Sequence, residues 1–240
     1  MRETTFDIGT ADGPMDTYAV RPDGAGPWPA VFFFMDGLGV RAVLRDMARH
    51  LAAQGYAVFL PNLYHRGGHA DTLHLDTDPS RLGELFSTVT KTSMQTDIGA
   101  LLRHADGDSA VRPGPVGCVG YCMGGRVALT AAACFQERVA AAASIHGAQL
   151  AVDHPDSPHR LADQWRGKIY VAVAEDDPWL QPDETEHLRS ALDEAGANHA
   201  LEIYRGATHG FAVPGLAAYN ETAAERHWRR IFELFQQQLQ

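Results

Sequence analysis

The chain has 240 residues, of which 45% are hydrophobic and 21% are charged, a composition that is typical of a globular protein and excludes disordered, collagen-like and coiled-coil classes. Twenty basic against thirty acidic side chains give a formal charge of -10 without any basic cluster, so nucleic acid and anionic membrane surfaces are poor candidate partners. The N-terminal residues lack the apolar core of a secretory signal, and no apolar run is long enough to cross a bilayer, so we expect a cytoplasmic protein.

The first half of the chain predicts a hairpin followed by a parallel crossover unit. Residues 4–10 and 15–21, separated by turn residues, are typical of a short hairpin at a sheet edge. An apolar run at 29–35 has the length of a buried strand, apolar residues recur at helical spacing over 40–54, and a second buried strand is expected at 56–60. This order of strand, helix and strand favours a parallel sheet.

The second half continues the alternation after a long loop, which the Gly-, Pro-, Asp- and His-rich residues 61–80 predict. The expected elements are helical segments over 82–105 broken near Thr90, strands at 116–120, 139–145, 168–174 and 200–204, and helices at 124–135, 183–195 and 223–239. The last helix carries an apolar stripe of Trp228, Ile231, Phe232, Phe235 and Leu239. Because no linker or repeat interrupts the pattern, we predict one α/β domain over 1–240, with a doubly wound, mostly parallel sheet and an antiparallel N-terminal edge.

The three cysteines, Cys118, Cys122 and Cys134, are interpreted as thiols, because an odd number in a chain without an export signal argues against disulfides. Cys122 stands where a strand must turn sharply into a helix, with Gly120 and Gly124 two residues away on either side. This is the GxSxG pattern of a nucleophile elbow with cysteine in place of serine. The helix start favours the thiolate, so Cys122 is the candidate nucleophile, with a buried thiol as the alternative.

A thiol nucleophile needs a base, and the base needs an acidic residue to orient it. The acid candidates Glu175, Asp176 and Asp177 follow a predicted strand, and we favour Asp177 because the proline after it fixes the loop. The base candidate is His209, the one histidine that follows the last predicted strand at the place required by this order of residues.

Backbone N–H groups that stabilise a developing oxyanion usually follow the nucleophile and an earlier strand. Met123 occupies the first position. Gly37, in the loop after the strand at 29–35, is the candidate for the second, because the missing side chain would let a substrate approach.

Five motifs, in this order, resemble the dienelactone hydrolase family: MDGLG at 35–39, PNLY at 61–64, GYCMGG at 120–125, EDDP at 175–178 and GATHGF at 206–211. The likeness runs from about residue 28 to the C-terminal helix. It implies the α/β-hydrolase fold and hydrolysis of a small ester or lactone, without a cofactor or a metal. Cys122 would attack the carbonyl and form an acyl-thioester, His209 would shuttle the proton, and Asp177 would orient His209.

The resemblance also assigns roles outside the triad. In the family an acidic residue of the first oxyanion loop contacts the resting thiol and gates it, and the counterpart here is Asp36, where the family pattern has the longer Glu. Met35 replaces the histidine common before it, and Gly210 stands where true dienelactone hydrolases have a polar residue. Family members hold the substrate carboxylate with arginines, and Arg81 is a possible counterpart.

Further residues are candidates for the lining of the substrate pocket: Tyr64, His146, Trp179 and Phe211. For the last three, ordinary core packing explains the residue about as well. The loop histidines His65, His69 and His74 match no tight metal-ligand spacing, so solvated side chains are favoured over a metal-dependent hydrolase built on them.

A second class of function stays open at this point, namely a non-catalytic or redox-sensing protein of the same fold in which Cys122 binds a ligand or is oxidised. For the enzyme, the expected partner is a small-molecule ester or lactone. The chain is expected to be a monomer or a homodimer.

Overall fold

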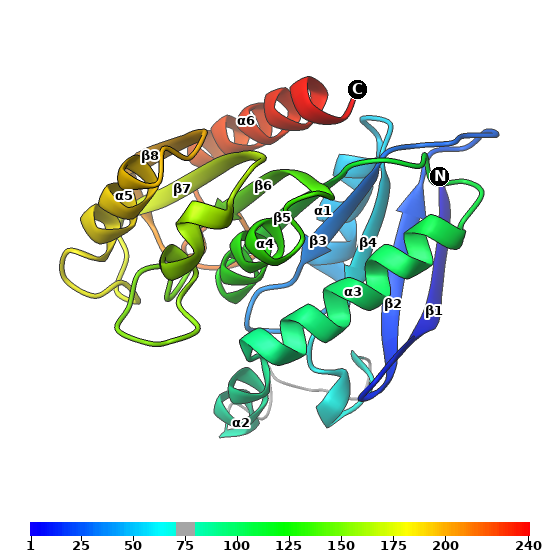
Figure 1. Ribbon diagram of the computed structural model, residues 1–240, viewed down its shortest axis with the longest axis horizontal. Helices are drawn as coiled ribbons and strands as arrows, with labels where there is room; N and C mark the ends of the chain where they lie inside the picture. The colour runs from blue at the N-terminus through cyan, green and yellow to red at the C-terminus, as the bar shows by residue number, and fades with distance from the viewer. Residues whose placement is uncertain (71–79) are drawn as a thin grey trace. The chain divides into compact units, whose positions relative to one another are not determined.

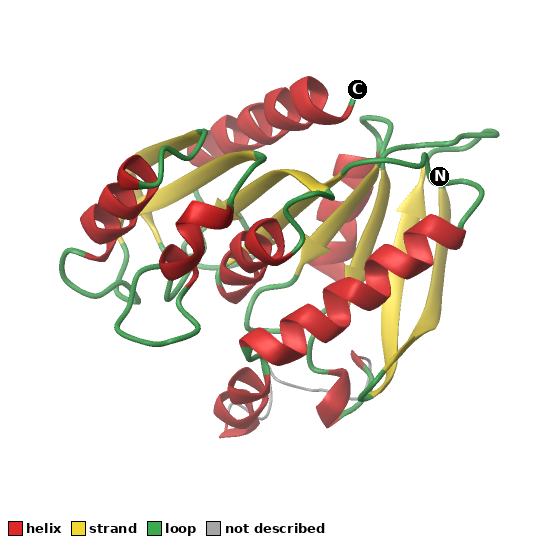
Figure 2. Ribbon diagram, viewed as in Figure 1, coloured by secondary structure: helices red, strands yellow, loops and turns green. Residues whose placement is uncertain are grey.

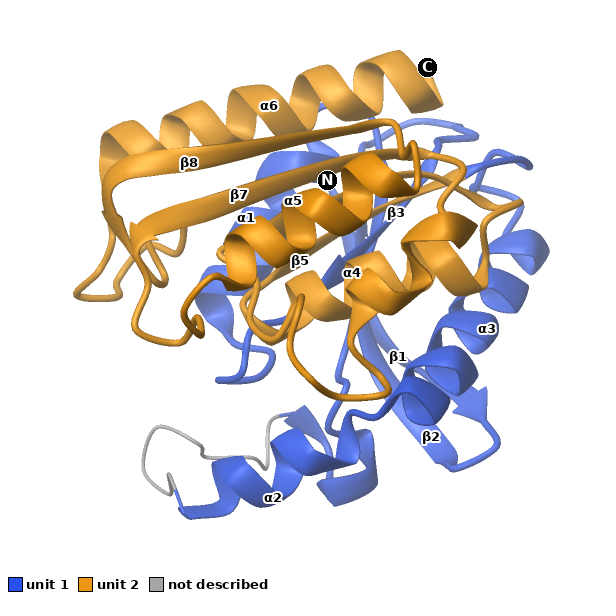
Figure 3. Cartoon of the chain, turned by 60° about the vertical axis from the view of Figure 1, so that its left-hand side comes forward, with its two compact units in different colours: residues 1–115 blue, residues 116–240 orange. Residues whose placement is uncertain are grey.

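The computed structural model describes residues 1–70 and 80–240, so residues 71–79 of the predicted loop lie outside the described part. Contacts group the chain into two compact units, residues 1–115 and 116–240, which Figure 3 draws in different colours. The single domain over 1–240 stays a prediction. Among the described residues, no helix is both long and apolar enough to serve as a transmembrane span.

The first unit contains the antiparallel edge that the sequence predicts. Its strands are β1 (Arg2–Thr10), β2 (Gly13–Arg21), β3 (Ala30–Phe34) and β4 (Ala57–Pro61), and its helical segments are α1 (Ala42–Ala52), η1 (His65–Gly67), α2 (Ser80–Thr88) and α3 (Lys91–Gly107). β1 and β2 form a hairpin, β2 pairs antiparallel with β4, and β4 pairs parallel with β3. The crossover from β3 through α1 to β4 is therefore confirmed (Figure 1).

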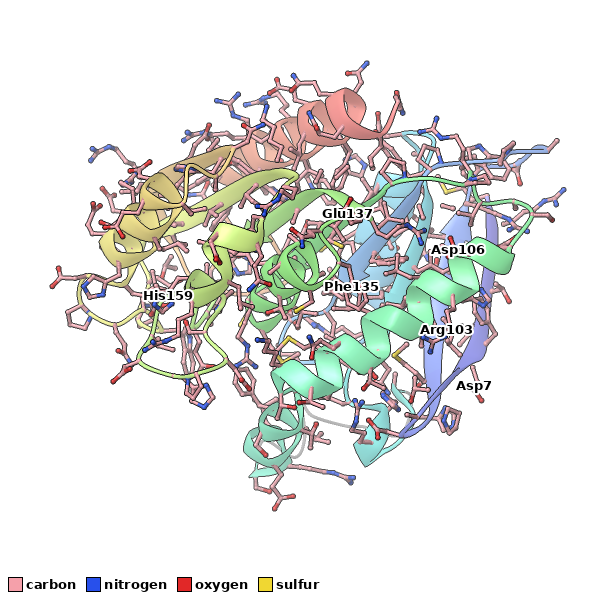
Figure 4. All side chains as sticks on the ribbon, in the orientation of Figure 1. Asp7, Arg103, Asp106, Phe135, Glu137 and His159 are labelled. Atoms are coloured by element: carbon pink, nitrogen blue, oxygen red, sulfur yellow. The ribbon has the colours of Figure 1, made fainter. Side chains whose placement is uncertain are left out.

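Local sequence explains the helices of this unit. All five residues of β3 and of β4 are buried, as expected for strands covered on both faces, and α1 and α3 lie on opposite faces (Figures 1 and 3). The break near Thr90 is confirmed, because Thr90 caps α3 in a capping box with Ser93. Arg103 and Asp106 lie on the exposed side of α3 (Figure 4).

The second unit consists of parallel strands alternating with helices (Figure 2). Its elements are β5 (Val116–Tyr121), α4 (Met123–Cys134), β6 (Val139–Ile145), η3 (Pro158–Gln164), β7 (Lys168–Asp176), α5 (Glu184–Glu194), β8 (His199–Thr208) and α6 (Glu221–Leu239). β5, β6, β7 and β8 pair in chain order, each parallel to the next. Figure 4 labels Phe135 and Glu137 where α4 ends and the chain turns toward β6.

Helices cover both faces of these strands, with α4 and α5 on one face and α6 on the other (Figures 1 and 3). α6 packs closely on β5 at Gly117, where a Cβ would lie 2.8 Å from side-chain atoms of both Phe235 and Leu239. The buried stripe of α6 is rotated from the predicted one. Trp228 and Phe232 are half-buried and stack on each other with ring centroids 5.5 Å apart.

Candidate functional site

The candidate nucleophile lies in a strained turn between β5 and α4. Cys122 has φ 53° and ψ -117°, a conformation that non-glycine residues rarely adopt. Backbone hydrogen bonds hold it there: the Cys122 N–H donates to the Ile145 carbonyl at 3.0 Å, and the Cys122 carbonyl accepts from Gly125 and Ala148 at 3.0 and 3.2 Å. The thiol is half-buried. The turn therefore has the geometry of the predicted nucleophile elbow.

The glycine before the nucleophile is required by the same turn. A Cβ at Gly120 would lie 1.8 Å from the carbonyl oxygen of Gly124, which is backbone and cannot rotate away. The glycine pair thus lets the start of α4 approach the end of β5. Met123 is the first residue of α4, where backbone N–H groups point out of the helix start.

The candidate acid and base stand side by side, each one residue beyond a strand. β7 extends to Asp176 and β8 to Thr208, and these two residues pair across the ladder. The next residues, Asp177 and His209, are joined by a hydrogen bond of 2.7 Å between Oδ2 and Nδ1. The other carboxylate oxygen, Oδ1, accepts from the backbone N–H of Trp179 at 3.0 Å. Asp177 therefore holds His209 in one orientation.

The two other acidic candidates are engaged elsewhere. Glu175 accepts hydrogen bonds from Arg205 at 3.1 Å and from the backbone N–H of Gly206 at 2.8 Å, on the exposed part of the sheet. Asp176 is an exposed residue of β7. Among the three, Asp177 is thus the one that the structure brings to His209, with only 1% of its side chain exposed.

Electrostatics couple His209 to the thiol. Burial is the largest single influence and lowers the pKa of His209, but hydrogen bonds and charge interactions with Asp177 and Cys122 outweigh burial and raise it to about 9. Since Nδ1 is bonded to Asp177, Nε2 is the ring nitrogen left to interact with Cys122.

His146 packs against His209 and is unusual in its burial and its backbone conformation. It is 1% exposed, has a φ of 38°, and its ring centroid lies 5.0 Å from that of His209 in a T-shaped arrangement. Neither ring nitrogen has a hydrogen-bond partner among the described residues. Burial, and then the charges of His209 and His227, hold the pKa of His146 well below its usual range, so the ring is neutral.

The aromatic candidates differ in exposure. Trp179 is 70% exposed, with its ring centroid 6.2 Å from that of His209, so its side chain is available to a ligand beside the dyad. Phe211 is fully buried, stacks on Tyr204 at 4.8 Å and meets His146 edge-on at 5.3 Å. Its contacts are those of a core residue, and a contact with substrate stays a prediction for both.

In the first unit, an ion pair occupies the acidic residue of the loop after β3. Asp36, 4% exposed, is held in a bidentate pair by Arg41 with distances of 2.5 and 2.7 Å, and also accepts the N–H of Leu38 at 3.0 Å. Tyr64 is buried and donates from its hydroxyl to the carbonyl of Gly37 at 3.0 Å. The predicted oxyanion loop is thus fixed from two sides. The gating role of Asp36 stays a prediction.

The remaining candidates of the first unit lie in local hydrogen-bond networks. Arg81 donates to the carbonyl of Gly67 at 2.5 Å. His65 is not solvated as predicted: its side chain is 1% exposed and lies 3.1 Å from Asp97. His69, which is 53% exposed, lies 3.7 Å from Asp16.

Outside residues 71–79, no group of three or more His, Cys, Asp or Glu is arranged to hold a metal ion. His74 lies within 71–79, outside the described residues.

Sequence reasoning missed two contributors. Arg41 gave a faint signal, a cation five residues after an acid. His227 gave none, because it lies on α6 far along the chain. Its Nε2 lies 3.2 Å from the hydroxyl of Tyr121, and its ring meets Phe211 edge-on at 6.2 Å, so it completes the aromatic cluster behind the elbow.

Comparison with known proteins places this geometry in a family context. A model of the dienelactone hydrolase family matches residues 15–239. A protein of Synechocystis sp. named "Putative carboxymethylenebutenolidase" is 28% identical over 226 residues, which cover 92% of this chain and 91% of that protein. A Bradyrhizobium protein named "Probable 2-oxo-3-(5-oxofuran-2-ylidene)propanoate lactonase" is 27% identical over 226 residues, with 92% and 89% covered.

A solved structure from Klebsiella pneumoniae, described as a "Putative Dienelactone Hydrolase", superposes with a TM-score of 0.89 at 27% identity and covers 98% of both chains. Together with the parallel strands and the antiparallel edge described above, this similarity confirms the α/β-hydrolase fold that the motifs imply.

Proposed function

Because the chain belongs to the dienelactone hydrolase family, we propose that it hydrolyses a small lactone or ester with a triad of Cys122, His209 and Asp177. The names of its relatives, a carboxymethylenebutenolidase and a furan-ring lactonase, favour a lactone as the substrate class. The observation that carries the proposal is the hydrogen bond between Asp177 and His209, together with a nucleophile elbow whose Cys122 side chain helps to raise the pKa of His209.

The chemistry follows from this arrangement. The Cys122 sulfur passes its proton to His209, attacks the carbonyl carbon and forms a tetrahedral oxyanion, to which the N–H of Met123 donates, with Gly37 as the predicted second donor. When the oxyanion collapses, the C–O bond to the leaving group breaks and His209 gives that oxygen its proton. In a lactone the leaving hydroxyl remains part of the acyl chain, so the product of this half is one acyl-thioester on Cys122.

The second half returns the enzyme to its starting state. His209, now neutral, removes a proton from a water molecule, whose oxygen attacks the thioester carbonyl. The C–S bond breaks, the carboxylic acid leaves, and the sulfur takes the proton back from His209. Asp177 keeps Nδ1 of His209 protonated throughout, so that Nε2 is always the nitrogen that faces the chemistry.

The test is turnover of p-nitrophenyl acetate and of a simple γ-lactone by wild type, Cys122→Ala and Cys122→Ser. We expect Cys122→Ala to lose turnover completely while keeping the wild-type circular dichroism spectrum. A burst of one equivalent of p-nitrophenol followed by steady turnover identifies the acyl-thioester. Full turnover by Cys122→Ala would refute the triad.

A redox-sensing function is the second candidate, and the half-buried thiol of Cys122 favours it too, because a cysteine that solvent can reach can be oxidised by peroxide. Sulfenic acid on Cys122 in the absence of any ester or lactone turnover would establish it. Loss of turnover with a strong chelator would instead favour the metal-dependent alternative.

A further inference from the structure

A buried histidine without hydrogen-bond partners requires a physical explanation. An imidazole that leaves water without gaining a hydrogen bond loses about 1–3 kcal/mol for each polar group. His146 leaves both ring nitrogens without a partner among the described residues, and it also adopts a φ of 38° that strains a non-glycine backbone. Its backbone N–H donates to the carbonyl of Ala172 at 2.8 Å, which holds the main chain in this conformation.

The same ring borders a small cavity. The cavity is lined by residues at and just after the ends of β6 and β7 and in the first turns of α5: His146, Gly147, Leu150, Val173, Asp177, Leu180, Glu184, Thr185 and Leu188. About 10 Å³ of it is open to the centre of a water molecule, which is the room that one water needs. Its lining is apolar apart from a few groups, among them the carboxylate of Asp177.

We propose that this cavity binds one water molecule, which links a ring nitrogen of His146 to the Asp177 carboxylate and makes His146 a positioning residue for His209. Each hydrogen-bond donor in this arrangement has an acceptor. A neutral imidazole has one N–H donor, which the water oxygen accepts, and the water then donates one hydrogen to Asp177. Thr185, also on the cavity wall, offers an acceptor for the other hydrogen.

The water would add a third hydrogen bond to a carboxylate that already accepts from Trp179 and His209. A carboxylate held at three points rotates less, so His209 keeps its orientation toward Cys122 through the catalytic cycle. This inference deepens the proposed function because it concerns the same acid and base, but the water site itself can be tested without any turnover.

The experiment is a set of high-resolution crystal structures of the full chain in three forms: wild type, His146→Phe and His146→Asn. We expect electron density for one water within hydrogen-bond distance of both His146 and Asp177 in the wild type. Phe keeps the ring without nitrogens, so the water should be lost. Asn tolerates a positive φ and keeps a donor, so the water should be retained.

The kinetic readout is kcat/KM for p-nitrophenyl acetate. We expect a loss of about tenfold in His146→Phe, which corresponds to about 1.4 kcal/mol, and recovery of most of it in His146→Asn. Val173→Ala is the matched control, because it changes an apolar wall of the same cavity and leaves every polar group in place. It should keep the water and a kcat/KM close to that of wild type.

Absence of an ordered water from the wild-type cavity would overturn the proposal, and so would a water retained in His146→Phe. An equal loss of kcat/KM in the Phe and Asn variants would reduce His146 to a packing residue. If His146→Phe does not fold, the wild-type and His146→Asn structures decide the water site. Turnover retained by Cys122→Ala would remove the proposed function without affecting these structures.

Discussion

The pKa of His209 depends on two neighbouring residues, Asp177 and Cys122. The hydrogen bonds and charges of Asp177 and Cys122 raise the pKa of His209 to about 9 in spite of burial. Removing the sulfur in Cys122→Ala removes one of these partners, so we expect the pKa of His209 to fall. Histidine ring signals followed by NMR during a pH titration measure the shift directly.

Cys118→Ala is the control for that titration, since Cys118 is fully buried in β5 and is not among the groups that shift His209. Burial alone raises the pKa of its thiol, so it stays neutral. Its replacement should leave the His209 titration unchanged. A pKa of His209 that is the same in wild type and Cys122→Ala would contradict the coupling.

At Trp179, an effect of the side chain on substrate binding can be measured separately from an effect on protein stability. Its backbone N–H holds Asp177, whereas its side chain is 70% exposed beside His209. We expect Trp179→Ala to leave the thermal midpoint of unfolding unchanged. It should raise KM for aryl esters several-fold, because the loss of an aromatic contact costs about 0.5–1.5 kcal/mol of binding free energy. Short alkyl esters serve as the comparison. An equal rise in KM for both series would show that Trp179 does not select aromatic groups.

At the scale of elements, the sequence predicted each strand of both units but not the full length of the last two. The strand predicted at 200–204 runs as β8 over His199–Thr208, and β7 extends to Asp176. Polar residues dominate both extensions, so hydrophobic periodicity has nothing to detect there. They are strands because the ladder continues past an irregularity between Ala174 and Asp176. This pairing places Asp177 and His209 beside each other. The sequence predicted only the order of these two residues along the chain, because the extended pairing leaves no hydrophobic pattern.

Gly120 tests the fit between β5 and α4. A Cβ there would overlap the backbone of Gly124, so we expect Gly120→Ala to destabilise the protein by about 3 kcal/mol or more. Gly83→Ala is the matched control, because that glycine lies in α2 with nothing within 4 Å of its Cβ position. It should gain up to about 1 kcal/mol from helix propensity. Urea unfolding measures both. Equal stability of the two variants would contradict the close approach.

At the scale of the whole molecule, histidines whose pKa values are shifted in the folded chain contribute to the pH dependence of stability. Burial lowers the pKa values of His50, His104, His146 and His159. At pH values below about 6.5, the pKa of these histidines in the unfolded chain, the unfolded chain binds protons that the folded chain does not bind. The free energy of unfolding therefore falls as pH falls. His209 acts in the opposite direction. Its contribution is complete below about 6.5 and is lost as pH rises toward 9.

The free energy of unfolding should therefore pass through a maximum near neutral pH, which urea titrations between about pH 5 and 9 can locate. His209→Gln should flatten the alkaline decline. His104→Phe, which keeps a ring against Phe6, should make the acidic decline shallower. A wild-type pH dependence in both variants would contradict these assignments.

What the sequence could not supply at this scale are contacts that depend on three-dimensional proximity. The elbow, the acid and the base follow a local rule of strand ends, so Cys122, Asp177 and His209 could be placed in order. The bidentate pair of Asp36 with Arg41, and the ring nitrogens of His146 that lack a hydrogen-bond partner among the described residues, leave no local pattern, because each depends on where a side chain points.

The register of β7 and β8 has a consequence for how such a protein can diversify. Asp176 and Thr208 are paired across the ladder, so Asp177 and His209 each lie one residue beyond the same pair, and the spacing of the neighbouring strands fixes the separation of acid and base. The loop after Asp177, which carries Trp179, can therefore accept new side chains without resetting that separation. Selectivity toward new esters can evolve there while the reactive chemistry is inherited unchanged.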